Sequence, residues 1–218
     1  MTGLVAADGH RLQAYEAVPV GAARGGVVVV QEIFGVNDHI RRVADGYAAD
    51  GYRVIAPALF DRVRPGIELG YTDADIAEGR KIRGQLTFEQ ALADVEAARK
   101  ALGDGNIGIV GYCWGGTVTW LAAARLPGFA AAASYYGGGI GQFAVEHPRC
   151  PTQCHFGEKD HAIPLTEVAA VRDANPAVEV YTYPAGHGFN CDARASFDAA
   201  AAKLARERTL AFFRKHIG

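Results

Sequence analysis

The sequence predicts an α/β protein with a mostly parallel central sheet and helices on both faces. Short apolar or alternating runs typical of strands recur along the chain, and helix-like stretches separate most of them. Strands that alternate with helices form parallel sheets, because each helix carries the chain back across one face of the sheet. A chain of 218 residues is long enough for one domain with a full core, so we expect a single domain over residues 1–218.

The expected strands differ in how they are covered. Residues 11–18 alternate between apolar and polar side chains, as in a strand with one covered face. Residues 27–30 are all valine, and such a run is typical of a strand covered on both faces. The expected strands are 11–18, 27–30, 52–56, 107–110, 130–136, 151–156 and 178–183.

Helix-like segments lie between these strands. Asn37 or Asp38 is a suitable N-cap for the first of them. Residues 58–73 carry a proline and glycines and are expected to form a loop before a polar helix. The expected helices are 37–50, 74–84, 88–102, 117–125, 164–174 and 195–215.

Composition and charge argue against several classes of partner. The net charge is −2 and no block of like charges occurs, which argues against nucleic acid or an anionic membrane surface as a partner. Residues 105–124 and 126–145 lack charged side chains, but their glycines favour buried strand–turn–helix units over membrane spans. Residues 1–10 carry no apolar signal core, so we expect a cytoplasmic protein with reduced thiols.

A metal site is not favoured by the pattern of cysteines and histidines. Cys150 and Cys154 are four residues apart with His155 adjacent, but this is not the spacing of a zinc knuckle, and Cys154 is expected in a core strand. We therefore expect no metal and no other cofactor. Five histidines are interpreted as surface or helix residues: His10, His39, His147, His155 and His216.

Residues 111–115 read Gly-Tyr-Cys-Trp-Gly and match the nucleophile elbow, with cysteine in place of the usual serine. The pattern follows a predicted strand and precedes a predicted helix, which is the context that the elbow requires. The glycines at either end let strand and helix pass close together, and the helix N-terminus favours a thiolate. The alternative is an inert buried cysteine at a tight turn. The flanking glycines favour Cys113 as the nucleophile.

A thiol nucleophile needs a base and a group that orients the base. In α/β hydrolases the chain order is nucleophile, acid, histidine. Asp160 follows the strand at 151–156, and His187 lies between glycines after the strand at 178–183. This order makes Asp160 the acid and His187 the base, with His161 a neighbour. The alternative is that both loops are ordinary turns without a catalytic role. Their position after successive strands, with the acid before the histidine, favours the catalytic interpretation.

The segment after the valine strand completes this picture. In this fold the loop there provides one backbone N–H of the oxyanion hole, and the residue after the nucleophile provides the other. The expected donors are the amides of Ile33 and Trp114. Glu32 lies at the strand end, where a buried carboxylate needs a partner, and a purely structural role is its alternative interpretation.

The chain at this point resembles the dienelactone hydrolase (carboxymethylenebutenolidase) family over nearly its whole length. The resemblance rests on Gln-Glu-Ile-Phe-Gly-Val-Asn at 31–37, Gly-Tyr-Cys-Trp-Gly-Gly at 111–116, Tyr-Tyr-Gly at 135–137, Gly-x-x-Asp-His at 157–161, Ala-Gly-His-Gly-Phe at 185–189 and Glu-Arg-Thr-Leu at 207–210.

The resemblance implies an eight-stranded α/β-hydrolase sheet and a triad of Cys113, His187 and Asp160. It implies that Glu32 takes part in switching the cysteine to its reactive thiolate when substrate binds. The implied reaction is hydrolysis of dienelactone, an unsaturated lactone carrying a carboxylate, to maleylacetate in chloroaromatic degradation.

The residues that would hold the substrate carboxylate depart from the family. One family arginine lies in the polar helix, where an ungapped alignment places Ile76. The second follows the catalytic histidine by four residues, where this chain has Cys191. The candidate substrate-binding residues are Arg80, Arg83, Tyr135 and Arg194, for which solvated arginines and a core tyrosine are the alternatives.

Three other functions remain open. A broader carboxylesterase or thioesterase would use the same triad. A binding module without catalysis would keep only the pocket. A thiol redox protein would pair Cys113 with Cys191. The partner is expected to be a small lactone or ester, and the sequence is compatible with a monomer.

Overall fold

The computed structural model describes residues 1–218 and is built around one eight-stranded sheet with the order β1-β2-β4-β3-β5-β6-β7-β8. Strands from β4 through β8 in this order run parallel. At the β1 end of this order, β2 pairs antiparallel with both β1 and β4. The α/β class is therefore confirmed. The strands are β1 Thr2–Val5, β2 Arg11–Ala17, β3 Gly26–Val30, β4 Arg53–Pro57, β5 Ile107–Tyr112, β6 Ala131–Tyr135, β7 Thr152–Gly157 and β8 Glu179–Tyr183.

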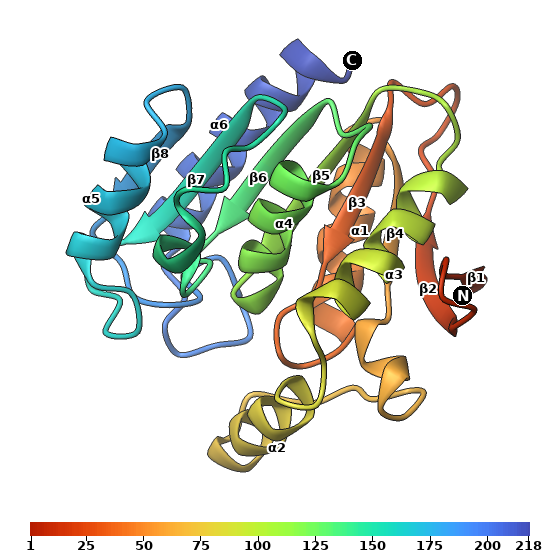
Figure 1. Cartoon of the computed structure of the whole chain (residues 1–218), viewed down its shortest axis with the longest axis horizontal. Coiled ribbons are helices and arrows are strands. Elements are labelled where there is room, and N and C mark those ends of the chain that lie inside the picture. Colours follow the sequence, from red (N-terminus) through yellow and green to blue (C-terminus); the bar gives the residue numbers. More distant parts are fainter.

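Helices cover both faces of this sheet. Figure 1 shows α3, α4 and α5 on the near face and α1 and α6 on the far face. The strand β3 between these layers is buried at every residue, as its valine run predicts. The helices are α1 Asp38–Ala49, α2 Asp73–Arg83, α3 Phe88–Ala101, α4 Trp114–Arg125, α5 Leu165–Ala174 and α6 Ala199–His216, with 3-10 turns at Leu59–Arg62 and Ile140–Phe143.

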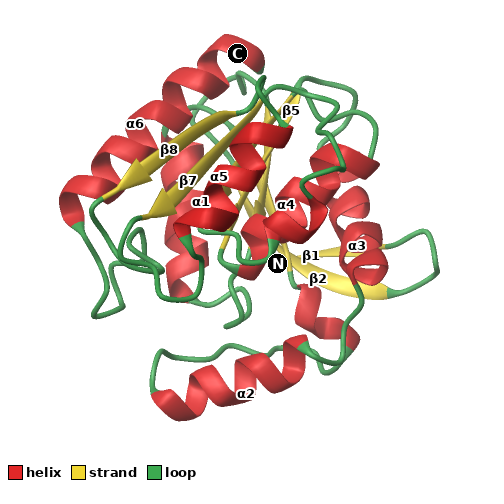
Figure 2. Ribbon diagram, turned by 60° about the vertical axis from the view of Figure 1, so that its left-hand side comes forward, coloured by secondary structure: helices red, strands yellow, loops and turns green.

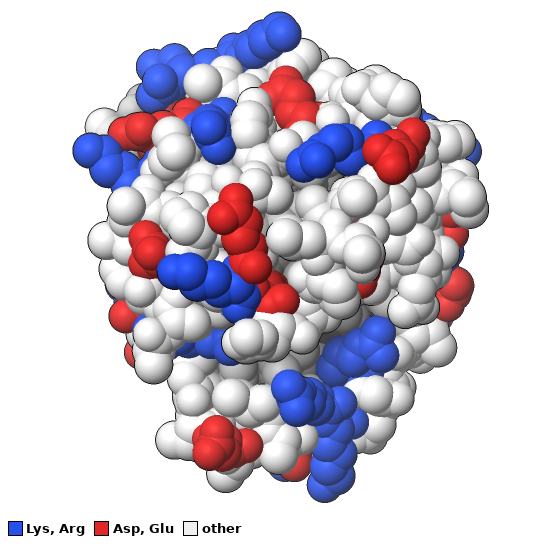
Figure 3. All heavy atoms as spheres, turned by 90° about the vertical axis from the view of Figure 1, so that its left-hand side faces the viewer, with Lys and Arg blue, Asp and Glu red and all other residues white.

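The helix α2 has an unusual place in this fold. Figure 2 shows it set apart from the two helical layers, below the ends of the strands. Its N-terminus is held by a capping box in which Thr72 and Asp75 bond each other's backbone N–H. Basic residues fill its last turn. On the face drawn in Figure 3, basic side chains gather at this lower end, next to a hollow.

The structure differs from the sequence-based elements at several ends. The strand β1 was not expected; it pairs antiparallel with β2 and buries Leu4, so its support comes from tertiary packing. Helix α4 begins at Trp114 rather than residue 117, because Gly115 and Gly116 are helical despite their low propensity. Helix α6 begins at Ala199 rather than 195, since Asp198 caps it by accepting the Ala201 N–H.

His155 corrects another expectation. It is not a surface or helix residue but lies fully buried in β7, where its ring stacks on Tyr135 with centroids 4.5 Å apart. Burial, with a smaller contribution from Arg208, lowers the pKa of His155 to about 3. The strand predicted at 151–156 contains this position, so a place inside the sheet could have been inferred from the sequence. Finally, no helix of the structure combines the length and the apolar character needed to cross a bilayer.

Candidate active site

Cys113 lies between β5 and α4 in a backbone conformation that non-glycine residues rarely adopt, with φ 57° and ψ −121°. The surrounding chain holds this conformation. Its N–H donates to the Tyr135 carbonyl over 3.0 Å. A Cβ at Gly111 would strike the Gly115 carbonyl, and one at Gly115 would strike the carbonyls of Val30 and Gln31. The two glycines are therefore needed for the close approach of β5, α4 and the chain after β3.

Three side chains from separate loops meet at this elbow. His187 Nε2 lies 3.1 Å from Cys113 Sγ, and His187 Nδ1 lies 2.7 Å from Asp160 Oδ2. The Asp160 carboxylate is fully buried, and its other oxygen accepts the Ala162 N–H over 2.8 Å. The structure thus places a thiol, an imidazole and a carboxylate in one continuous chain of contacts.

The imidazole of His187 has a strongly perturbed pKa. Burial disfavours the charged ring, but the negative charge of a Cys113 thiolate and the hydrogen bond to Asp160 outweigh this effect. Together they raise the pKa of His187 to about 10. An imidazole that stays protonated at neutral pH beside a cysteine sulfur favours the thiolate form, which is the form of cysteine that acts as a nucleophile.

The two residues whose amides are the expected oxyanion donors both border the pocket that contains Cys113. Trp114 is the first residue of α4, so its N–H has no acceptor within the helix. Ile33 follows β3 in a segment that Gln31 anchors, because Gln31 Oε1 accepts the Leu59 N–H over 3.1 Å. Ile33, Trp114 and Cys113 line the same pocket. The assignment of these two amides as oxyanion donors stays a prediction.

This pocket has a volume of about 280 Å³ and is rich in arginine. Arg80 and Arg83 reach it from α2, and Arg194 reaches it from the loop after His187. Helix α2 packs closely here, since a Cβ at Gly79 would strike the Ile33 carbonyl. The lining residues are Ile33, Phe34, Ile76, Arg80, Arg83, Cys113, Trp114, Thr117, Gly138, Ala162, His187 and Arg194.

Tyr135 does not line this pocket, which corrects its placement as a substrate-binding candidate. Its ring is buried in the core, and its hydroxyl lies 2.7 Å from Thr209 Oγ1. The following residue, Tyr136, is the one that turns toward the site. Its φ of 37° ends the strand geometry, and its ring lies 5.2 Å from that of His187. The Tyr-Tyr pair lies at the predicted place, but the alternation of a strand could not show which of the two rings approaches His187.

Glu32 lies deep beside the pocket and contacts an arginine rather than Cys113. Its carboxylate is buried, and Oε1 lies 3.4 Å from Arg194 Nη1. The second oxygen, Oε2, has no hydrogen-bond partner. Arg194 also packs over the ring of Phe34, with the guanidinium carbon 5.7 Å from the centroid. The ion pair therefore links Glu32 to a side chain that faces the pocket.

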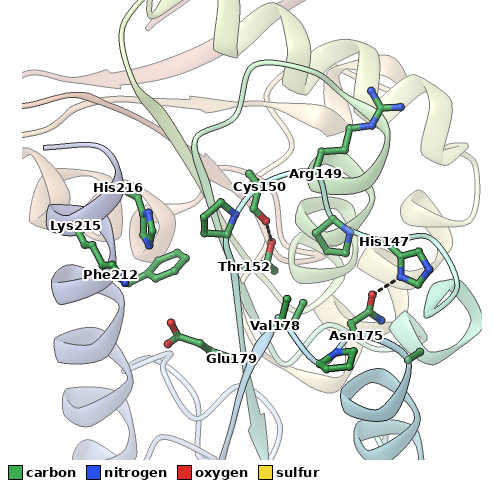
Figure 4. Close-up of a pocket in the computed structure, with 15 residues that line it drawn as sticks. His147, Arg149, Cys150, Thr152, Asn175, Val178, Glu179, Phe212, Lys215 and His216 are labelled. Atoms are coloured by element: carbon green, nitrogen blue, oxygen red, sulfur yellow. Dashed lines mark hydrogen bonds between the residues drawn. The ribbon is translucent and has the colours of Figure 1, made fainter.

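A larger pocket of about 690 Å³ lies at the amino ends of the parallel strands, where β7 and β8 begin, and thus opposite to the carboxyl ends that carry Cys113 and His187. Figure 4 shows Cys150, Thr152 and Glu179 on its walls, with Phe212, Lys215 and His216 of α6 on one side. Cys150 is thus separated from the next cysteine, Cys154, which is buried within β7. Cys154 and His155 are neighbours in one strand and point to opposite faces of the sheet.

Comparisons with known proteins give a consistent picture. The model of the dienelactone hydrolase family matches residues 12–217. A carboxymethylenebutenolidase from Pseudomonas putida is 34% identical and covers 94% of this chain and 92% of its own. A "putative carboxymethylenebutenolidase" from Synechocystis sp. is 37% identical, covering 99% and 97%.

A solved structure supports the same assignment. The crystal structure of a "putative dienelactone hydrolase" from Klebsiella pneumoniae superposes with a TM-score of 0.86 at 33% identity, covering 98% of each chain. Sequence, fold and the residues at the elbow agree, and the chain belongs to the dienelactone hydrolase family of α/β hydrolases, which act on ester or lactone bonds.

Proposed function

We propose that this enzyme hydrolyses small lactones that carry a carboxylate, with dienelactone as its substrate and Cys113 as its nucleophile. The observation that carries the proposal is the combination of the Cys113–His187–Asp160 contacts with three arginines around one small pocket. A pocket of about 280 Å³ matches a compact substrate, and clustered guanidinium groups match a carboxylate.

In the first step the Cys113 thiolate attacks the lactone carbonyl carbon. The amides of Ile33 and Trp114 stabilise the negative oxygen that forms, and one such donor contributes about 3 kcal/mol. The carbon–oxygen bond of the ring then breaks. The enolate leaves with a proton from His187, and the acyl group stays on sulfur as a thioester.

In the second step water hydrolyses the thioester. His187, now neutral, takes a proton from the water, which attacks the acyl carbon. The second tetrahedral intermediate collapses, the thiolate leaves, and maleylacetate is released. Asp160 holds the imidazole in the tautomer that exposes Nε2 toward the reacting atoms. The cycle restores the thiolate–imidazolium pair.

The leaving group explains the choice of sulfur. A thiolate leaves more readily than an amine, so a cysteine at this type of elbow suits esters whose own leaving group is stable. An enolate is such a group, whereas the amine of a peptide is not. The site therefore supports ester and lactone hydrolysis rather than peptide hydrolysis.

A broader carboxylesterase activity is the second candidate. The ion pair between Arg194 and Glu32 favours it, because this arginine is already partly neutralised by a protein carboxylate. Ile76 adds an apolar side chain to the same pocket. An enzyme of this kind would accept neutral esters as well as anionic lactones.

The test is steady-state hydrolysis of cis- and trans-dienelactone and of p-nitrophenyl acetate at pH 7. Wild type should turn over dienelactone with a much higher kcat/KM than the neutral ester, and Cys113→Ala should lose both activities. Mass spectrometry of the enzyme quenched during turnover should show the acyl adduct on Cys113. Turnover of the neutral ester alone would retain the mechanism and replace the proposed substrate.

A further inference from the structure

Three potential metal ligands meet in the interior behind the pocket, outside the Cys113–His187–Asp160 set. Glu32 follows β3, His39 belongs to the first turn of α1, and Cys191 lies in the loop after His187. One ligand atom of each lies within 4.8 Å of those of the other two, and all three residues are buried. A carboxylate, an imidazole and a thiol that are distant in sequence are thus gathered in one place.

Two of these side chains lack the partners that buried polar groups require. Glu32 Oε2 and His39 Nε2 have no hydrogen-bond partner, although the residues are 0% and 4% exposed. A buried carboxylate oxygen and a buried ring nitrogen without partners are each unfavourable. A cation between them would satisfy both atoms at once.

A carboxylate orients the ring of His39, as is common for histidines that bind metals. Its Nδ1 lies 3.1 Å from Asp192 Oδ1, and Arg42 Nη2 holds the same oxygen at 2.9 Å. A carboxylate at Nδ1 keeps the proton on that nitrogen and leaves a lone pair on Nε2. Metal-binding histidines are commonly oriented by a carboxylate in this way. Asp192 also adjoins Cys191, so one short segment supplies both a ligand and its support.

Of the three ligands, His39 borders a hollow at the surface. A hollow of about 380 Å³ is bordered by Asn37, His39 and Tyr71 and opens between α1 and the segment before α2. The Arg194 contact does not compete for the same atom, since it uses Glu32 Oε1 and leaves Oε2 free.

We propose that Glu32 Oε2, His39 Nε2 and Cys191 Sγ form a binding site for a divalent transition-metal ion, with Zn²⁺ as the best match. Oxygen, nitrogen and sulfur donors together suit zinc, and three protein ligands leave one position for water. Binding releases the thiol proton of Cys191 to solvent, and no oxidation or reduction is involved. Since Glu32 also holds Arg194, occupancy would weaken that ion pair and change the charge that faces the pocket.

The experiment uses the full chain carrying Cys113→Ala, so that the catalytic sulfur cannot bind the ion. Zn²⁺ affinity is measured by competition with a chromogenic chelator, and Co²⁺ is added separately to reveal a thiolate-to-cobalt absorption band. We expect one ion per chain and a clear band. Adding Cys191→Ser should abolish the band, and adding His39→Gln should weaken binding by at least about 100-fold. Asp192→Asn should weaken it roughly 10- to 100-fold.

Adding Cys154→Ser is the matched control, because that thiol is equally buried but lies in β7, and it should leave affinity unchanged. Circular dichroism and melting curves establish that each variant is folded, and His39→Gln and Cys191→Ser test the site independently. The proposal is overturned if Cys113→Ala binds no Zn²⁺, which would place any ion at the catalytic thiol. It is also overturned if binding persists unchanged in both ligand variants.

Discussion

The central sheet has two edges formed by strand ends, one by the amino ends of its parallel strands and one by their carboxyl ends. Both carry the same kinds of reactive side chain but arrange them differently. At the edge where β7 and β8 begin, the larger pocket contains Cys150, His147 and Glu179 (Figure 4). His147 bonds Asn175 there, and burial raises the pKa of the Cys150 thiol to about 11. At the other edge, beside a pocket less than half as large, His187 contacts both Cys113 and Asp160.

This difference shows that strand direction, rather than cavity size, decides where reactive side chains come into contact with one another. Loops that follow parallel strands converge at the carboxyl edge, so side chains after β5, β7 and β8 meet there. Helix α4 also begins at this edge and directs its positive N-terminal end at Cys113. The loops at the amino edge bring side chains near one another without a nucleophile in contact with a base.

The largest expected effect comes from removing one thiol at each edge. Cys113→Ala should lower kcat/KM for dienelactone by roughly 10⁴-fold or more, as loss of a nucleophile does in comparable triads. Cys150→Ala should leave it within about twofold, because nothing at that edge activates the thiol. Steady-state kinetics on both folded variants measure this. Comparable activity losses in the two variants would remove the contrast between the edges.

A smaller loss is expected from a methyl group at the elbow. The Cβ in Gly115→Ala would strike the Val30 and Gln31 carbonyls and displace the segment that carries Ile33. Loss of one oxyanion donor lowers kcat by roughly 10²- to 10³-fold. Gly138→Ala is the control, since Gly138 lines the same pocket and its Cβ would meet only Ile163 at an ordinary 3.8 Å. Equal kcat values for the two variants would contradict the assignment of the donors.

The next prediction compares the removal of one positive charge from each of the two pockets. Arg194→Gln should raise KM for dienelactone roughly 10-fold, in line with the loss of a charge-assisted contact, and should leave p-nitrophenyl acetate hydrolysis nearly unchanged. Lys215→Gln removes a positive charge from the larger pocket and should affect neither substrate. If Arg194→Gln slows both substrates equally, the arginine supports the site through Glu32 and does not contact the substrate carboxylate.

The smallest effect concerns stability and pH. The pKa of His187 is raised to about 10 in the folded chain, from an ordinary value of 6.5. The stabilisation that protonated His187 gains from its surroundings is therefore fully present below pH 6.5 and is lost as the pH rises toward 10. The free energy of unfolding should fall more between pH 7 and 10 in wild type than in Cys113→Ala. Denaturant unfolding at both pH values measures this, with Cys150→Ala expected to follow wild type.

Much of this architecture could be predicted because its signals are local. Several patterns predict the structure of the same residues that carry them. They are the valine run of β3, the polar residues that cap α1 and the glycines around Cys113. Parallel strand order then implies which loops share an edge, so Asp160 and His187 could be chosen by their position after successive strands. The exposed antiparallel strand β1 lacked such a local signal and depends on pairing with β2.

Side-chain direction and long-range pairing needed the tertiary structure. A positive φ at Tyr136 turns that ring toward His187 and leaves Tyr135 in the core, and strand alternation cannot reveal this exchange. The contact between Glu32 and Arg194 joins residues 162 positions apart, through a loop whose path no local pattern specifies.

The sequence by itself determined the fold class and the order of the candidate catalytic residues, because hydrophobic periodicity and turn chemistry are properties of adjacent residues. The family was indicated by the resemblance of its motifs. Only the tertiary structure decided that the three candidate arginines face the pocket rather than solvent, which tyrosine approaches His187, and that Glu32, His39 and Cys191 share one buried space. Those outcomes depend on how separate loops pack against one another, and packing is a property of the whole chain rather than of any segment.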